Sequence, residues 1–134
     1  MTIILRRQII NRIVRIGKRR HILGAEVQQL DALHQFFLQL GIAEGAYQLA
    51  LDWSEKREQF GRPINEFQGL QWKLADMSIK LSAARALVYN AARSGEGGFP
   101  DMLMAAQAKV FTSENAIQVV NDALQFFGAR GYSR

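Results

Sequence analysis

Residues 57–68 read REQFGRPINEFQ and join two long stretches whose apolar residues recur every three or four positions. Gly61 and Pro63 predict a tight turn, because glycine tolerates unusual backbone angles and proline fixes its own. Arg57 and Arg62 contribute permanent positive charge on planar guanidinium groups, which suit phosphate oxygens. The sequence therefore predicts an elbow between two helices with more specific chemistry than a simple connection needs.

Two further side chains of this elbow extend its chemistry. Phe60 offers a flat aromatic face and Gln68 offers an amide, so that the segment has the groups needed to hold a nucleotide. Residue types alone also allow ordinary structural roles. Arg57 is equally suited to the C-terminus of a helix, where a cation is favourable. Phe60 could simply cover the loop, and Gln68 could only cap a helix.

Apolar periodicity predicts one long helix on each side of the elbow. The first extends from about Asp31 to Ser54. The second is predicted to begin at Asn65, with Gln68 completing a capping box, and to end near Ser94. Its spacing of four and three residues is typical of helices packed against antiparallel neighbours. The predicted core seam of this second helix comprises Leu70, Leu74, Met77, Leu81, Ala84 and Val88.

A third helix is predicted to begin after Asp101, whose carboxylate suits an N-cap, and to end at Gly128. Its predicted core seam comprises Leu103, Ala106, Val110, Ile117, Val120, Leu124 and Phe127.

Apolar residues outside the predicted seams are Phe67, Trp72 and Ile79 in the second helix and Met104, Phe111 and Phe126 in the third. We therefore predict an all-α fold, an up-down bundle of three long helices whose surplus apolar surface suits a fourth helix or a partner chain. No segment after the first residues alternates with a period of two, so strands are not expected.

The composition limits the classes of function. With 134 residues, of which 49% are hydrophobic, the chain is long enough for one domain with a core. The absence of cysteine excludes disulfides, cysteine-ligated zinc and a thiol nucleophile. His21 and His34 belong to no cluster with metal-ligand spacing, so no metal site is predicted. The sequence has no run of eighteen apolar residues, so no membrane-spanning helix is expected.

Residues 1–24 differ in charge from the rest of the chain. They contain seven Lys or Arg and no acid, whereas residues 25–134 have a net charge of −2, so the total of +5 comes from the N-terminus. Three interpretations are open: a basic amphipathic helix on an anionic membrane, an organelle transit segment, or a tail outside the fold. We therefore separate an atypical basic segment, residues 1–24, from a helical domain, residues 25–134. Nonspecific attraction to nucleic acid follows from the charge, but no motif predicts a specific nucleic-acid partner.

Several blocks between about Gly41 and Arg134 resemble the acyl-CoA dehydrogenase family. They are GIAEGAY at 41–47, the elbow with its continuation to Met77, AKVF at 108–111 and QFFGARGY at 125–132. The second block resembles the family signature R-x-x-F-G-x-x-I-x-x-x-Q-x-x-x-x-x-L-A-D-M. The resemblance implies the C-terminal four-helix-bundle domain of that family, truncated after its third long helix.

The resemblance implies an FAD-dependent oxidoreductase of fatty acid metabolism that converts acyl-CoA to trans-2-enoyl-CoA. Members are usually homotetramers in which neighbouring subunits share the flavin. By resemblance, Arg57 would bind the FAD pyrophosphate, Phe60 would lie beside the cofactor, and Gln68 would bind its adenosine portion. The residues implied near the FAD at the end of the third helix are Gln125, Phe126, Phe127, Gly128 and Ala129. The family often has two adjacent glycines where this chain has Gly128-Ala129.

The substrate-binding and catalytic parts of the family pattern are incomplete in this chain. Asp31 matches the aspartate of a substrate-binding D-G-G-R or D-A-G-R run, but the arginine of that run is missing. The family's catalytic glutamate commonly lies in a Y-E-G-T run beyond the block at which this chain ends. We therefore assign no catalytic residue and expect no turnover by the chain alone. One hypothesis is a truncated or misread gene whose first forty codons are partly out of frame.

The expected partners follow from the same resemblance. They are further copies of this chain or longer acyl-CoA dehydrogenase subunits, with acyl-CoA as substrate and FAD as a cofactor that one chain alone is not expected to hold. A non-catalytic helical interaction module is the alternative function, because the surplus apolar surface suits association. The expected compartment is a bacterial cytoplasm, with a mitochondrial matrix as the alternative.

Overall fold

The structure is a computed structural model that describes residues 24–95 and 99–133. Its three long helices are α2 (Gly24–Lys56), α3 (Gln68–Arg93) and α4 (Met102–Phe127). Two short strands, β1 (Glu58–Gln59) and β2 (Arg62–Pro63), and the 3-10 turn η1 (Ile64–Glu66) join α2 to α3, and the 3-10 turn η2 (Gly128–Gly131) follows α4. The predicted all-α bundle of three long helices is confirmed. The predicted segment at residues 1–24 lies almost entirely outside the described residues.

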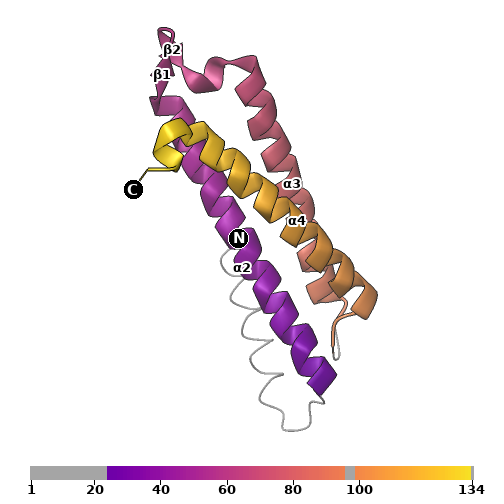
Figure 1. Cartoon of the computed structure of the whole chain (residues 1–134). Coiled ribbons are helices and arrows are strands. Elements are labelled where there is room, and N and C mark those ends of the chain that lie inside the picture. The colour runs from indigo at the N-terminus through magenta and orange to yellow at the C-terminus, as the bar shows by residue number, and fades with distance from the viewer. Residues whose placement is uncertain (1–23, 96–98, 134) are drawn as a thin grey trace.

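The order of the helices brings two C-termini together. Because α3 returns antiparallel to α2 and α4 reverses again, α2 and α4 run in the same direction (Figure 1). The C-terminal end of α4 and the turn η2 therefore lie beside the hairpin that follows α2, while the connection between α3 and α4 lies at the opposite end (Figure 1). This arrangement places the elbow segment next to residues from the far end of the chain.

The elbow contains the one clear departure from the predicted secondary structure. Glu58 pairs with Pro63 and Gln59 with Arg62 in an antiparallel ladder, so the expectation of no strands is wrong at this point. Strands of two residues are too short to produce a detectable alternation in the sequence. The hairpin turns through residues 60 and 61, whose φ angles are 54° and 80°. Positive φ at both central positions is the geometry of a type I′ turn.

The C-terminal ends of α3 and α4 lie at Ser94 and Gly128 as predicted, whereas two of the predicted N-terminal ends differ. The Asp101 carboxylate accepts a hydrogen bond of 2.8 Å from the Met104 N–H, which confirms the predicted N-cap of α4. The capping box at Asn65 is wrong, because α3 begins only at Gln68, after a 3-10 turn, and has no side-chain cap. The first helix begins at Gly24, before the predicted start, and therefore extends further toward the N-terminus than its apolar pattern indicates.

The core forms between one face of each helix. The buried residues of α3 include five of the six predicted seam residues, and the sixth, Leu70, is half-buried against the same core. On α2 the buried residues Phe36, Leu40, Ala43 and Ala50 point toward α3 and α4. Two ion pairs fix neighbouring helices: Lys73 of α3 with Asp122 of α4, and Arg85 of α3 with Glu44 of α2. Each pair is partly exposed, so its contribution to stability is about 0–1 kcal/mol.

The predicted seam of α4 is wrong. The residues that α4 buries are Ala105, Ala108, Thr112, Val119, Ala123 and Phe126. Leu103, Val110 and Ile117 are instead 67%, 55% and 64% exposed. The helix has two apolar stripes, and the one with alanines faces the core, because small side chains allow the helices to approach closely. We call the other stripe, Leu103, Val110, Ile117 and Leu124, the outer stripe of α4.

Gly41 and Gly45 of α2 are not used for close helix packing among the described residues. A β-carbon added at Gly41 or Gly45 would have no neighbouring atom within 4 Å. Within residues 24–95 and 99–133, no helix is long and apolar enough to cross a membrane.

Candidate functional site

Arg57 lies at the point where α2 ends, and its backbone is fixed from both sides. Its N–H donates to the Trp53 carbonyl at 2.9 Å, which continues the helical pattern. Its carbonyl accepts a hydrogen bond of 2.8 Å from the Ile64 N–H, which closes the base of the hairpin. The side chain of Arg57 is exposed. The elbow therefore presents a guanidinium group from a rigid backbone.

The tip of the hairpin presents an aromatic side chain at a cost in backbone strain. Phe60 adopts a φ of 54° although it has a β-carbon, a conformation that costs about 1–2 kcal/mol. It is 93% exposed and makes an edge contact with Phe67, with ring centroids 6.3 Å apart. The guanidinium of Arg62 lies 4.2 Å from the centroid of the same Phe67 ring. Strain of this kind is concentrated at functional sites, so the exposed ring is a candidate contact surface.

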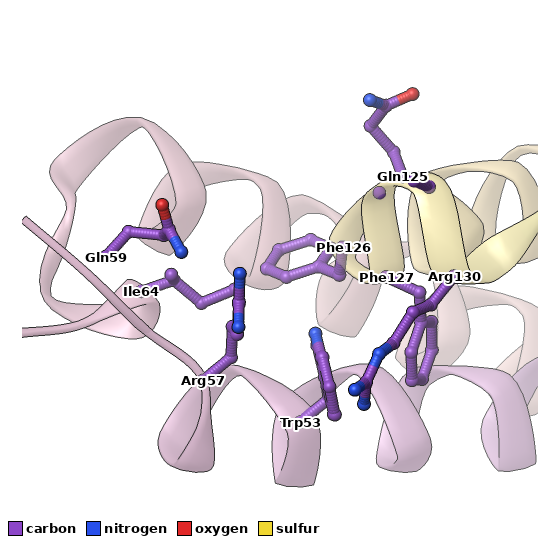
Figure 2. A pocket seen from close by; sticks show the side chains of 10 residues that line it. Trp53, Arg57, Gln59, Ile64, Gln125, Phe126, Phe127 and Arg130 are labelled. Atoms are coloured by element: carbon purple, nitrogen blue, oxygen red, sulfur yellow. The ribbon is translucent and has the colours of Figure 1, made fainter.

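A cavity of about 440 Å³ opens between the elbow and the C-terminal end of α4 (Figure 2). Its lining residues come from the end of α2, the hairpin, η1, the last residues of α4 and η2. They are Trp53, Arg57, Gln59, Ile64, Gln125, Phe126, Phe127, Gly128, Ala129 and Arg130. This set includes two arginines and no acidic residue. The cavity is therefore electropositive, with aromatic and apolar walls.

Six of the eight residues predicted to bind a cofactor line this cavity: Arg57 and the run from Gln125 to Ala129. The other two, Phe60 and Gln68, are exposed and lie outside its lining, at the hairpin tip and the start of α3. Asp31, predicted to bind substrate, is exposed on α2 and lies 22 residues before Trp53. That separation corresponds to about 33 Å of helix. Asp31 therefore cannot share a small site with Arg57.

Four lining residues were not predicted: Trp53, Gln59, Ile64 and Arg130. Trp53 stacks on Phe127 with ring centroids 5.5 Å apart and an interplanar angle of 29°. The Arg130 guanidinium lies 5.1 Å from the centroid of the Trp53 ring. A signal for Trp53 was available, because it lies one helical turn before Arg57 and on the same face. Arg130 lies within the block at residues 125–132, but no spacing rule indicates that it meets α2.

Within residues 24–95 and 99–133, the two arginines of the cavity have no carboxylate partner. Among the described residues, no carboxylate forms an ion pair with Arg57 or Arg130. Figure 2 shows both guanidinium groups on either side of Trp53, whereas the Gln125 amide points away from them. Two helices end at this cavity, and their C-termini contribute partial negative charge. The arginines offset that charge and leave the cavity able to accept an anion.

The backbone at the end of α4 and in η2, which forms one wall of the cavity, has an unusual conformation. Gly128 ends α4 with a φ of 56° and a ψ of −132°, a conformation that only glycine adopts without strain. A β-carbon on Gly131 would lie 2.7 Å from the Leu124 carbonyl oxygen, so that η2 turns back tightly onto α4. The turn brings Ala129 and Arg130 to the lining of the cavity. Phosphate chemistry fits this set of groups, because guanidinium donors, exposed backbone and aromatic surfaces together match a dinucleotide.

Comparison with known proteins identifies the family of the chain. Residues 29–134 match the family model described as acyl-CoA dehydrogenase, C-terminal domain, which extends the resemblance upstream of Gly41. The chain is 65% identical over 95 residues to a 3-sulfinopropanoyl-CoA desulfinase of Paraburkholderia xenovorans, covering 71% of this chain and 24% of that protein. It is 45% identical over 95 residues to a probable acyl-CoA dehydrogenase of Mycobacterium tuberculosis, covering 70% of this chain and 24% of the relative.

A solved structure gives the same result for the fold. Butyryl-CoA dehydrogenase from Megasphaera elsdenii superposes with a TM-score of 0.75 at 42% identity, over 78% of this chain and 27% of that one. The chain thus spans about a quarter of the length of these relatives. The all-helical arrangement, the matched blocks and the family model lead to one conclusion. The chain belongs to the acyl-CoA dehydrogenase family and corresponds to its C-terminal domain.

Proposed function

We propose that this chain is the part of an acyl-CoA-processing flavoenzyme that contacts the diphosphate of FAD. The observation that supports the proposal most strongly is the cavity between the elbow and η2. Its lining includes Arg57, which forms no ion pair among the described residues, and the glycine-containing backbone at Gly128. A guanidinium group binds phosphate oxygens through two parallel hydrogen bonds, which gives both affinity and orientation. A volume of about 440 Å³ suits the diphosphate and an adjoining part of FAD rather than the whole cofactor.

FAD, when bound, would supply the hydride acceptor for oxidation of an acyl thioester. This chain's own residues would bind and orient. Arg57 would hold one phosphate, and the aromatic pair of Trp53 and Phe127 would shield that contact from water. The exposed ring of Phe60 would cover an outer part of the cofactor held mainly by another subunit. No side chain of the described residues is assigned a proton-transfer role.

A chimera tests this proposal in a complete protein. The 95 matching residues of this chain would replace their counterparts in the Paraburkholderia desulfinase, which is 65% identical over that segment. Flavin absorbance of the purified chimera, relative to the parent enzyme, measures how much FAD the new segment allows it to retain. We expect near-full FAD content, and a strong loss when the chimera carries Arg57→Gln. A folded chimera that retains FAD equally well with Arg57→Gln would contradict the proposal.

For the substrate, the comparisons favour a short CoA thioester with a sulfinate group. The identity to 3-sulfinopropanoyl-CoA desulfinases is 58–65% in four bacterial relatives. It falls to 45% for the relative named as a probable acyl-CoA dehydrogenase. We therefore propose that the parent enzyme acts on 3-sulfinopropanoyl-CoA rather than on an unsubstituted acyl-CoA. Sulfite release by the desulfinase chimera, compared with butyryl-CoA oxidation by the same segment placed in the Megasphaera elsdenii butyryl-CoA dehydrogenase, tests which of the two enzymes accepts this segment without loss of activity.

The outer stripe of α4 supports a second candidate function, that of a helical interaction module. Its four apolar residues recur every seven positions and are exposed. Such spacing places all four on one side of a helix, in the pattern of a helix-packing seam. Analytical ultracentrifugation of the chain at several concentrations tests this candidate. We expect association that is reduced by Ile117→Lys, and a monomer at all concentrations would exclude it.

A further inference from the structure

Arg130 is the one charged residue of the cavity besides Arg57. It belongs to η2, far in sequence from the elbow, and reaches the cavity because η2 turns back tightly at Gly131. We propose that Arg130, positioned by the Trp53 ring, is a second phosphate-binding side chain that shares the diphosphate with Arg57. This inference rests on the proposed function, because it assigns a further residue to the same anion site.

Charge balance supports a second cation at this position. The diphosphate of a dinucleotide has one negative charge on each phosphate, and Arg57 neutralises only one. The C-termini of α2 and α4 both end at the cavity and add partial negative charge, which disfavours an anion. Since the lining includes no lysine or histidine, Arg130 is the residue that can supply the missing positive charge.

The contact with Trp53 holds the Arg130 side chain in a position from which it can bind phosphate. The guanidinium lies 5.1 Å from the centroid of the Trp53 ring, within the range of a cation–π interaction. Trp53 is in turn fixed by stacking on Phe127. A guanidinium that stacks through its face keeps its N–H groups free at the edge, so Arg130 can still donate to phosphate. Because the stack already restricts the rotamers of Arg130, the side chain loses less conformational entropy when it binds phosphate.

The alternative role for Arg130 is purely structural, as a cation that stabilises the end of α4. A residue with that role would affect unfolding but would not distinguish ligands with phosphate from ligands without it. The test therefore compares ADP, which is the diphosphate half of FAD, with adenosine, which has no phosphate. Both are titrated into the full 134-residue chain by isothermal calorimetry, and far-UV circular dichroism checks that each variant keeps its helix content.

One chain alone is not expected to hold the whole of FAD, but the cavity contains both arginines that would contact the diphosphate, so we expect ADP to bind more tightly than adenosine to the unmodified chain. Arg130→Gln should weaken ADP binding by about tenfold, the effect of losing one charge-assisted contact, and leave adenosine binding unchanged. Arg130→Lys should restore part of the ADP affinity, and Trp53→Leu should weaken ADP binding through loss of positioning. Arg93→Gln is the matched control, because Arg93 is an exposed arginine at the other end of α3.

The outcomes separate the two proposals. If Arg57→Gln abolishes the preference for ADP while Arg130→Gln leaves it intact, the role of Arg130 is refuted and the proposed function stands. Equal weakening of ADP and adenosine by Arg130→Gln would also refute it, because a structural role has that signature. If the unmodified chain shows no preference for ADP over adenosine, both the anion site and the role of Arg130 are wrong.

Discussion

At the scale of single residues, Gly131 determines whether η2 can close the cavity. A β-carbon at this position would lie 2.7 Å from the Leu124 carbonyl oxygen, and a backbone atom cannot move away easily. We predict that Gly131→Ala lowers the free energy of unfolding by about 1–3 kcal/mol. Gly69→Ala is the control, because a methyl at Gly69 has open space and alanine favours helix. Urea denaturation measures both, and equal stability of the two variants would contradict this account.

A substitution at Phe60 tests whether its strained backbone conformation is retained because the ring contacts the cofactor. Its positive φ is unfavourable for a residue with a β-carbon, whereas Asn-Gly is the preferred pair for a type I′ turn. We predict that Phe60→Asn stabilises the chain by about 1 kcal/mol. The same substitution should reduce FAD retention in the desulfinase chimera, since it removes the exposed ring. Thermal melting and flavin content measure the two effects, and a gain in both quantities would show that Phe60 has no cofactor role.

At the scale of elements, α4 shows where apolar pattern and packing diverge. Ile117 is 64% exposed, whereas the smaller Val119 is fully buried. We predict that Val119→Ala costs about 1–3 kcal/mol of unfolding free energy. Ile117→Ala should change it by less than about 0.5 kcal/mol in dilute solution. Urea denaturation at low protein concentration compares them, and a larger effect at Ile117 would mean that the outer stripe is the true core face.

The sequence predicts some elements of this molecule well and others poorly, for identifiable reasons. The seam of α3 is predicted well because α3 has one dominant apolar stripe, from Leu74 to Val88. The seam of α4 is mispredicted because large side chains dominate a hydrophobic pattern, while close packing here depends on alanines. Arg57 follows from the elbow sequence. Arg130 does not, because its approach to Trp53 depends on a tight turn that no local pattern encodes.

At the scale of the whole molecule, the outer stripe of α4 and the cavity both face outward. The chain spans about 24% of the length of the desulfinase it matches, so these 134 residues have no counterpart for most of that relative. We predict no oxidation of butyryl-CoA by the purified chain with added FAD and an artificial electron acceptor. Reduction of the acceptor, followed spectroscopically with and without substrate, checks this. Substrate-dependent turnover would mean that the described helices contain a complete active site.

If the elbow and η2 together hold a diphosphate, ADP added to the chain must perturb the residues of the cavity, and nuclear magnetic resonance during an ADP titration detects this. The reporters are the side-chain N–H signals of arginine and tryptophan in the full chain. We predict that ADP shifts the signals of Arg57, Arg130 and Trp53, which line the cavity, and leaves Trp72 and Arg93 unchanged. Shifts confined to residues outside the cavity, or no shifts at saturating ADP, would contradict the account.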